Sequence, residues 1–172
     1  QLVIDDRNHP VWARITSVLG EFLVKVEKET ILEWISNITI PAQPKFSVAR
    51  NFTKENKRVM LWDFGSNFKT WFMLMTEKAV GEVTVAVNRL QVRATLAEMT
   101  PEQPAPRIVT MSQIYWMLAQ QPKGEKPNGK NPCLLTNGYA NIFRIIDAKG
   151  IERAVSACWN EGRGWGVDAD EL

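Results

Sequence analysis

The sequence predicts a single α+β domain with N-terminal helices, a mixed central region containing a β-hairpin, and a three-stranded antiparallel meander at its C-terminal end. Three patterns carry this prediction. Apolar residues follow helical spacing over residues 12–26, they alternate in two runs of opposite phase within 82–96, and short apolar runs separated by turn formers follow residue 138. A chain of 172 residues can bury a core without disulfides or metals.

The N-terminal part of the chain predicts two helices. The first follows Pro10 and covers residues 12–26, where a strand over 22–26 is the alternative. The second begins at Thr30, because Thr30 and Glu33 have the spacing of a capping box. Its expected buried residues are Ile31, Trp34 and Ile35.

The densest aromatic run, residues 58–75, predicts the centre of the core. Residues 59–62 have the continuous apolar pattern of a buried strand, and Gly65 opens a turn. The helix that follows presents one apolar face and ends at Gly81 in a left-handed cap. The residues of that face are Phe68, Trp71, Phe72 and Met75.

The clearest strand pattern covers residues 82–96. The alternation changes face at Asn88 and Arg89, which requires either a tight turn or a bulge. We favour the turn, and therefore a hairpin of two strands. A further short strand is predicted over 45–49.

The C-terminal half begins with three prolines between residues 100 and 106, which predict an extended connection. The stretch 100–107 is the candidate boundary between two subdomains. A helix then runs from a cap at Ser112 to Pro122, with Ile114, Tyr115, Met117 and Leu118 buried. The strands of the meander are expected over 139–146, 151–159 and 165–169.

The composition is that of a soluble globular protein, with 45% apolar residues, 23% charged residues and a net charge of +2. That charge is too small to indicate a nucleic-acid or membrane partner, and no apolar run is long enough to span a bilayer. Cys133 and Cys158 predict buried thiols in an intracellular, cytoplasmic protein. Because the sequence begins at Gln1, a removed signal peptide is the alternative, and we attribute the N-glycosylation patterns at Asn37 and Asn51 to chance.

Gly124, Gly129 and Lys130 match most of a phosphate-binding loop. However, Asn131 replaces the hydroxyl residue that would bind magnesium, and Pro127 removes an amide that would contact phosphate. The element expected before the loop is also a helix rather than a strand. The pattern therefore indicates a solvated loop and not nucleotide hydrolysis.

No catalytic, metal-binding or cofactor-binding residue is predicted, and no cofactor. His9 is the only histidine and lies at an expected helix start, without a partner to orient it. Most carboxylates that lie close to one another in sequence, and so could act as an acid–base pair, are near the ends of the chain. Asp63 would be a candidate catalytic residue only if it lay in a pocket. An enzyme is therefore the hypothesis with the least support.

Basic residues concentrate in two expected loops, 50–58 and 123–130. They are Arg50, Lys54, Lys57, Arg58, Lys123, Lys126 and Lys130. If the loops converge, they form a surface on which a single-stranded nucleic acid could bind. The acidic residues Glu55 and Glu125 favour the simpler alternative of two separate solvated loops.

Among seven tryptophans, Trp159 and Trp165 flank a glycine-rich turn that also holds Arg163. They predict either an exposed contact surface or a pair packed across a hairpin. We predict a non-enzymatic protein-interaction or accessory module whose partner is another protein, with its two basic loops apart. The alternative is a nucleic-acid-binding accessory protein that uses loops 50–58 and 123–130.

Overall fold

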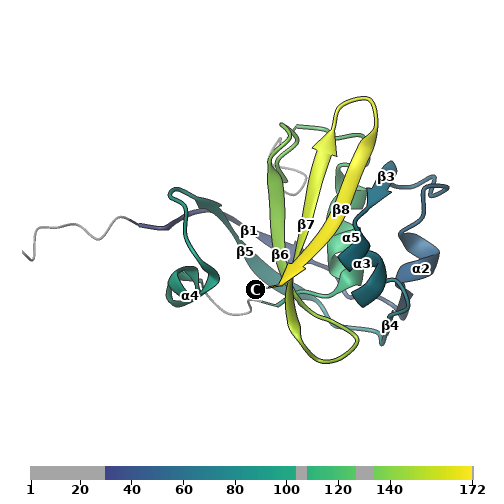
Figure 1. The fold of residues 1–172 in the computed structure, drawn as a ribbon, viewed down its shortest axis with the longest axis horizontal. Coiled ribbons are helices and arrows are strands. Elements are labelled where there is room, and N and C mark those ends of the chain that lie inside the picture. The colour runs from purple at the N-terminus through teal and green to yellow at the C-terminus, as the bar shows by residue number, and fades with distance from the viewer. Residues whose placement is uncertain (1–29, 104–107, 127–133, 172) are drawn as a thin grey trace, which may run out of the picture. The chain divides into compact units, whose positions relative to one another are not determined.

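The computed structural model describes residues 30–103, 108–126 and 134–171 (Figure 1). The chain divides into two compact units, Gln1–Thr30 and Ile31–Leu172, and all the described helices and strands belong to the second. The helix predicted over 12–26 lies outside the described residues. The subdomain boundary at 100–107 stays a prediction, because residues 104–107 also lie outside them.

A four-stranded sheet forms the centre of this unit. Its strands, in spatial order, are β3 (Leu61–Phe64), β8 (Gly164–Glu171), β7 (Glu152–Asn160) and β6 (Ala140–Ile146). Strands β6, β7 and β8 pair antiparallel, which confirms the predicted meander. The turns between them contain Gly150 and Gly162 with φ of 80° and 72°, a conformation that favours glycine. The α+β class is confirmed as well.

Strand β3 joins this sheet by a pairing that the sequence does not predict. It runs parallel to β8, with Leu61 opposite Trp165 and Phe64 opposite Val167. Parallel pairing requires a long crossover connection, so no local pattern marks it. The aromatic corner of the chain is thereby fixed directly to its last strand.

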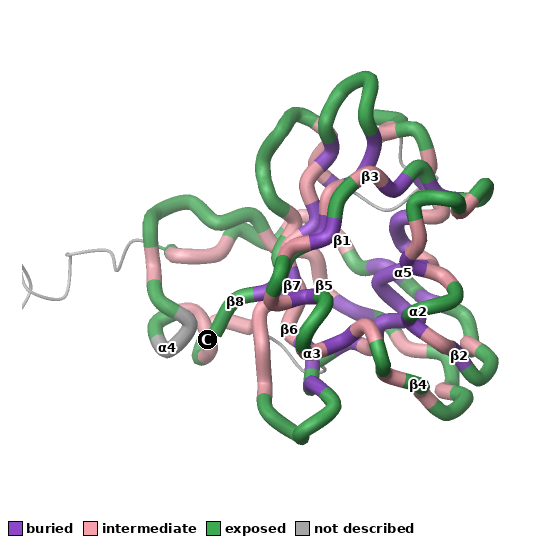
Figure 2. Tube along the Cα trace, turned by 45° about the vertical axis from the view of Figure 1, so that its right-hand side comes forward, coloured by how far each residue is buried: buried purple, intermediate pink, exposed green. Residues whose placement is uncertain are grey.

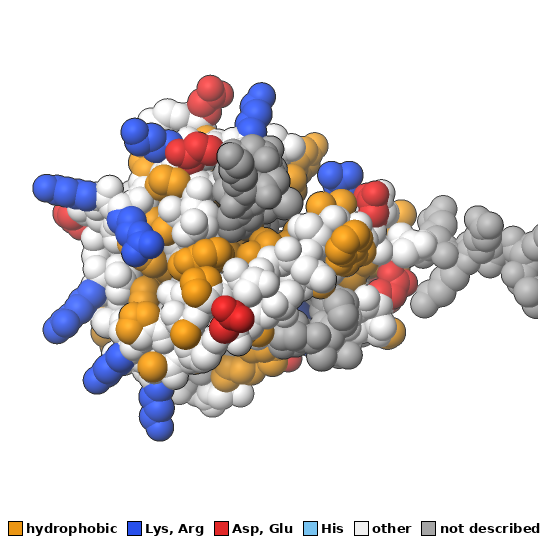
Figure 3. All heavy atoms as spheres, turned by 180° about the vertical axis from the view of Figure 1, so that it is seen from behind, with side chains coloured by type: hydrophobic (Ala, Val, Ile, Leu, Met, Phe, Trp, Pro, Cys, Tyr) orange, Lys and Arg blue, Asp and Glu red, His pale blue; other side chains and the backbone are white. Residues whose placement is uncertain are grey.

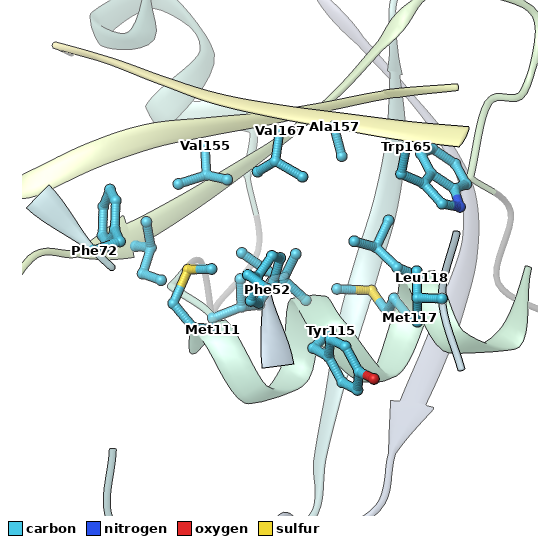
Figure 4. Packing of buried hydrophobic residues seen from close by; sticks show 14 of the residues in the cluster. Phe52, Phe72, Met111, Tyr115, Met117, Leu118, Val155, Ala157, Trp165 and Val167 are labelled. Atoms are coloured by element: carbon cyan, nitrogen blue, oxygen red, sulfur yellow. The ribbon is translucent and has the colours of Figure 1, made fainter. Parts of the chain in front are cut away.

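Helix α5 (Met111–Gln120) covers one face of the sheet, and the core lies between them (Figure 4). Val155 and Val167 extend from the sheet toward Met111 and Leu118 of the helix, with Phe52 between the two layers. Figure 2 shows the buried segments concentrated in α5 and the inner strands. The four apolar residues expected on the buried side of this helix are all buried.

The N-terminus of α5 is capped from two directions. Its N-cap is Thr110, two positions before the predicted Ser112, and Thr110 forms a reciprocal capping box with Gln113. The Glu77 carboxylate accepts hydrogen bonds from the backbone N–H groups of Met111 at 2.7 Å and Ser112 at 2.9 Å. These contacts satisfy donors that a helix start otherwise leaves unpaired.

The helix predicted from Thr30 is wrong. Residues Leu32–Ile40 form strand β1, which pairs antiparallel with β5 (Val83–Leu90). Trp34, expected in the core, is 60% exposed, whereas Ile38 and Ile40 are buried at alternate positions. The β-branched residues of 35–40 suit a strand, and pairing with β5 outweighs the local capping pattern.

The hairpin predicted within 82–96 is also wrong. One strand, β5, continues through Asn88 and Arg89, and its partner is β1. The register shift lies in β1, between Trp34 and Ser36, so a bulge in the partner strand accommodates the change of face.

The strand–turn–helix corner is confirmed, with β3 followed by Gly65 and helix α3 (Ser66–Trp71). Phe68 and Phe72 are fully buried, but Trp71 is only partly buried. The helix ends at Trp71, so the cap predicted at Gly81 is wrong. Gly81 lies beyond β4 (Thr76–Glu77) and has no positive φ.

The remaining elements are short. They are β2 (Phe46–Ser47), α2 (Val48–Asn51), α4 (Leu96–Met99) and the 3₁₀ helix η1 (Thr100–Glu102). Strand β2 pairs with β4, and α2 replaces the second half of the strand predicted over 45–49. Residues 100–102, predicted as extended, are helical instead. A proline near the first position of η1 is compatible with that helix.

Candidate functional site

The two basic loops meet at a single cleft of about 850 Å³. One wall comes from residues 56–60 and the other from residues 122–126. The turn between β7 and β8 and the residue Thr136 complete the lining. The cationic residues that line it are Lys57, Arg58, Lys123 and Lys126. The expectation that the loops lie apart is therefore wrong.

Backbone hydrogen bonds join the two walls to the sheet. The Met60 N–H donates to the Pro122 carbonyl at 3.2 Å, and the Met60 carbonyl accepts from the Trp165 N–H at 2.7 Å. The Trp165 indole Nε1 donates to the Gln121 carbonyl at 2.9 Å. Both walls are thus held against the start of β8.

Asn56 shapes the first wall. Its Oδ1 accepts from the backbone N–H groups of Arg58 at 2.8 Å and Val59 at 3.1 Å. Its Nδ2 donates to the Tyr115 hydroxyl at 2.9 Å and to the Asn51 carbonyl at 2.6 Å. One amide side chain therefore ties the turn that carries Lys57 and Arg58 to helix α5.

Gln121 shapes the second wall. Its fully buried side chain donates from Nε2 to the carbonyls of Glu125 at 2.6 Å and Leu134 at 3.2 Å. Its Oε1 accepts from the Leu134 N–H at 3.2 Å. Residues 121–125 are thereby fixed to the chain at Leu134. The sequence does not mark Gln121, because glutamine has no distinctive local pattern.

Trp159 lies beneath the cleft and packs on Trp165. Their rings meet edge to face with centroids 5.5 Å apart, and only 9% of Trp159 and none of Trp165 is exposed. The pair packed across the hairpin is confirmed, and the exposed contact surface is wrong. Gly124, with φ of +67°, lies so close to the Trp159 ring that a Cβ there would overlap it.

The four cationic side chains of the cleft are exposed. Within the described part of the chain, none of them forms an ion pair, and Glu161 is the sole carboxylate that lines the cleft. Four cations and one carboxylate leave an excess of positive charge around the hollow. Figure 3 shows Lys and Arg side chains projecting along the side of the molecule that carries α2 and β4, with acidic side chains interspersed above.

The other predicted binding residues lie elsewhere. Arg50, on α2, and Lys54, in the loop after it, are exposed but do not line the cleft. The Arg163 guanidinium lies over the Trp62 ring, 5.1 Å from its centroid. Lys130, and with it the end of the glycine–lysine pattern, lies outside the described residues. Helix α5 precedes that pattern, as expected.

The two candidates for catalysis that lie within the described residues, Asp63 and Cys158, gain no catalytic partner there. Asp63 is exposed on β3, and Cys158 is partly buried, with burial raising the pKa of its thiol. His9 and Cys133 lie outside the described residues. Within the ranges that are described, no group of three His, Cys, Asp or Glu side chains could hold a metal ion, and no helix is long and apolar enough to cross a membrane.

Comparison with known proteins gives no further guidance, since no family model, curated protein or solved structure matches the chain. The function must therefore be inferred from the cleft itself.

Proposed function

We propose that this protein is a non-enzymatic module that binds single-stranded nucleic acid in the cationic cleft. The observation that carries the proposal is the convergence of two basic segments, more than sixty positions apart in sequence, on one hollow. Phosphate contacts by lysine and arginine supply most of the nonspecific affinity for nucleic acids. Among the described residues, Lys57, Arg58, Lys123 and Lys126 have no ion-pair partner, which favours such contacts with a ligand.

The dimensions and lining of the cleft favour a single strand over a duplex. Its volume is in the range of ligand pockets, and Met60, Pro122 and the small exposed part of Trp159 add apolar surface beside the cations. Single-strand-binding proteins combine a basic groove with side chains, typically aromatic, on which the bases stack. Recognition of duplex DNA more often relies on a helix or ribbon that enters the major groove.

The proposal is tested by titrating labelled oligonucleotides of about 12 nucleotides, within the usual range of single-strand site sizes. We expect fluorescence anisotropy to show binding that weakens with salt. If all four cations contact phosphates, the slope of log affinity against log salt is about −3, from ~0.7 per contact. The quadruple variant Lys57→Gln, Arg58→Gln, Lys123→Gln, Lys126→Gln should lose both the affinity and the slope.

A matched control removes the same charge elsewhere. Lys69, Lys78, Arg93 and Lys149 are also exposed and do not line the cleft. Changing all four to Gln gives the same net charge as the cleft variant but leaves the cleft intact, so binding should be largely retained. Equal losses in the two variants would show that only total charge matters, and the proposal would then fail.

Binding of a protein partner is the second candidate. It is favoured by large apolar side chains exposed on and beside β6, with Tyr139 71% and Ile142 62% exposed. Exposed apolar side chains of this kind are common at protein interfaces when they cluster. If capture of a partner from a cell extract is unaffected by the double change Tyr139→Ser, Ile142→Lys, this candidate is wrong.

A further inference from the structure

Glu161 is an anomaly in the cleft. Within the described residues it is the sole carboxylate in the lining, and it forms no ion pair with the cations around it. A free carboxylate repels phosphate, so its presence weakens a site that recognises phosphate alone. A ligand that carries hydrogen-bond donors as well as phosphates would interact favourably with both Glu161 and the cations.

The backbone fixes where Glu161 lies. It belongs to the turn between β7 and β8, which is closed by the Arg163 N–H donating to the Asn160 carbonyl at 3.0 Å. Gly162, at φ of 72°, adopts the left-handed conformation that this turn requires. The nearby Arg163 side chain lies over Trp62, and the structure shows no ion pair between it and Glu161.

The chemistry of a carboxylate selects the part of the ligand that it meets. An ionised Glu only accepts hydrogen bonds, and in nucleic acids the exocyclic amines of bases are strong donors. Protein carboxylates accept from the N4 amine of cytosine in this way. Thymine has no exocyclic amine, and the two carbonyl oxygens that flank its single N3–H donor repel a carboxylate.

We infer that Glu161 is a specificity-determining residue, which accepts a hydrogen bond from an amine-bearing base while the cations hold the phosphates. This inference rests on the proposed function. This hydrogen bond would orient the bound nucleic acid. Its phosphate backbone would lie along the walls formed by residues 57–58 and 123–126, with one base directed toward the β7–β8 turn. The cleft then prefers cytosine over thymine instead of binding all single strands equally.

The test compares oligo-dC with oligo-dT of equal length on the full chain, at slightly alkaline pH where cytosine is unprotonated. We expect the unaltered protein to bind oligo-dC about tenfold more tightly, within the usual discrimination of one good base contact. Glu161→Ala should abolish the preference while leaving affinity for oligo-dT equal or higher, since repulsion is removed. Glu161→Gln, which keeps an acceptor oxygen, should retain part of the preference.

A control variant, Asp170→Ala, removes an exposed carboxylate at the opposite end of the sheet and should leave the preference unchanged. If Glu161→Ala raises affinity for both oligonucleotides by the same factor, Glu161 acts only by repulsion and the inference is overturned. Equal binding of both oligonucleotides by the unaltered protein also overturns it but leaves the proposed function intact. If neither oligonucleotide binds, both proposals fail.

Discussion

The two ends of the four-stranded sheet use the same charged residue types in opposite ways. At the β6–β7 turn, Arg153 is nearly buried, with its Nε 3.1 Å from Asp147 Oδ2 and its Nη1 3.2 Å from Glu171 Oε1. Its guanidinium also lies over the Trp71 ring, 4.0 Å from the centroid. At the other end, the cations of the cleft beside the β7–β8 turn are exposed and have no such partners among the described residues.

The difference separates charged residues that stabilise the fold from charged residues that are available to bind a ligand. A buried cation must be paired, because its desolvation is otherwise uncompensated. An exposed cation has no such requirement and contributes little to stability even when it is paired. Changes at the two ends should therefore affect different measurements, namely the free energy of unfolding at one end and ligand affinity at the other.

The largest expected loss of stability comes from Trp165→Ala, which removes the support of the cleft end. The ring is fully buried, and its indole N–H holds the Gln121 carbonyl. We expect a loss of about 3–5 kcal/mol in the free energy of unfolding, as for other large-to-small core changes. Chemical denaturation measures it. Trp34→Ala, at a tryptophan that is 60% exposed, is the control and should cost less than about 0.5 kcal/mol.

Arg153→Met should have the next largest effect. It keeps much of the apolar stem but leaves the Asp147 carboxylate buried without its cation, which costs about 3 kcal/mol. Oligonucleotide affinity should not change, since Arg153 lies at the other end of the sheet. Lys57→Met is the reciprocal variant, with little effect on denaturation and reduced affinity. If Arg153→Met weakens oligonucleotide binding as strongly as Lys57→Met does, the two ends of the sheet do not have the separate roles proposed here.

The smallest expected effect is a pH dependence at the paired end. Burial raises the pKa of Asp147, but hydrogen bonds from the backbone N–H groups of Ile151 and Lys149, together with Arg153, outweigh burial and hold the pKa below its ordinary value of 3.8. A carboxylate with a lowered folded pKa stabilises the fold above its unfolded pKa. That stabilisation is lost as the pH falls from about 3.8 through the lower, folded value.

Asp147→Asn should therefore flatten the acid limb of a plot of stability against pH. Thermal unfolding across a pH series measures this. Asp170→Asn, which removes an exposed carboxylate from the same end of the sheet, is the control. An unchanged acid limb in Asp147→Asn would show that another group determines the acid sensitivity of the fold.

Local signals in the sequence explain what could be predicted. The meander follows from alternating residues and glycine-containing turns, and the buried face of α5 follows from its helical spacing. The corner at Gly65 is similarly local. Strand β1 is not predicted, because the capping pattern at Thr30 and Glu33 is a local helix signal, whereas the partner that makes this segment a strand, β5, lies some fifty positions away.

The cleft could be predicted only in part. The sequence identifies Lys57, Arg58, Lys123 and Lys126 as members of two basic loops, but their convergence depends on contacts through Met60, Pro122 and Trp165. Glu125, which suggested balanced charge, does not line the cleft, and its carboxylate accepts a hydrogen bond from the Lys123 N–H. The roles of Asn56 and Gln121 depend on tertiary hydrogen bonds that leave no pattern in the sequence.

The parallel pairing of β3 with β8 has a consequence for the order in which the chain folds. Leu61 and Trp165 are more than a hundred positions apart, so their pairing closes a long loop. Closing that loop costs more chain entropy than closing the short turns of the β6–β7 and β7–β8 hairpins. The hairpins can form early from local contacts, whereas both walls of the cleft depend on the Met60–Trp165 contact. We expect the cleft to be the last region to assemble, with the Met60 amide gaining protection in pulsed hydrogen exchange after those of β7.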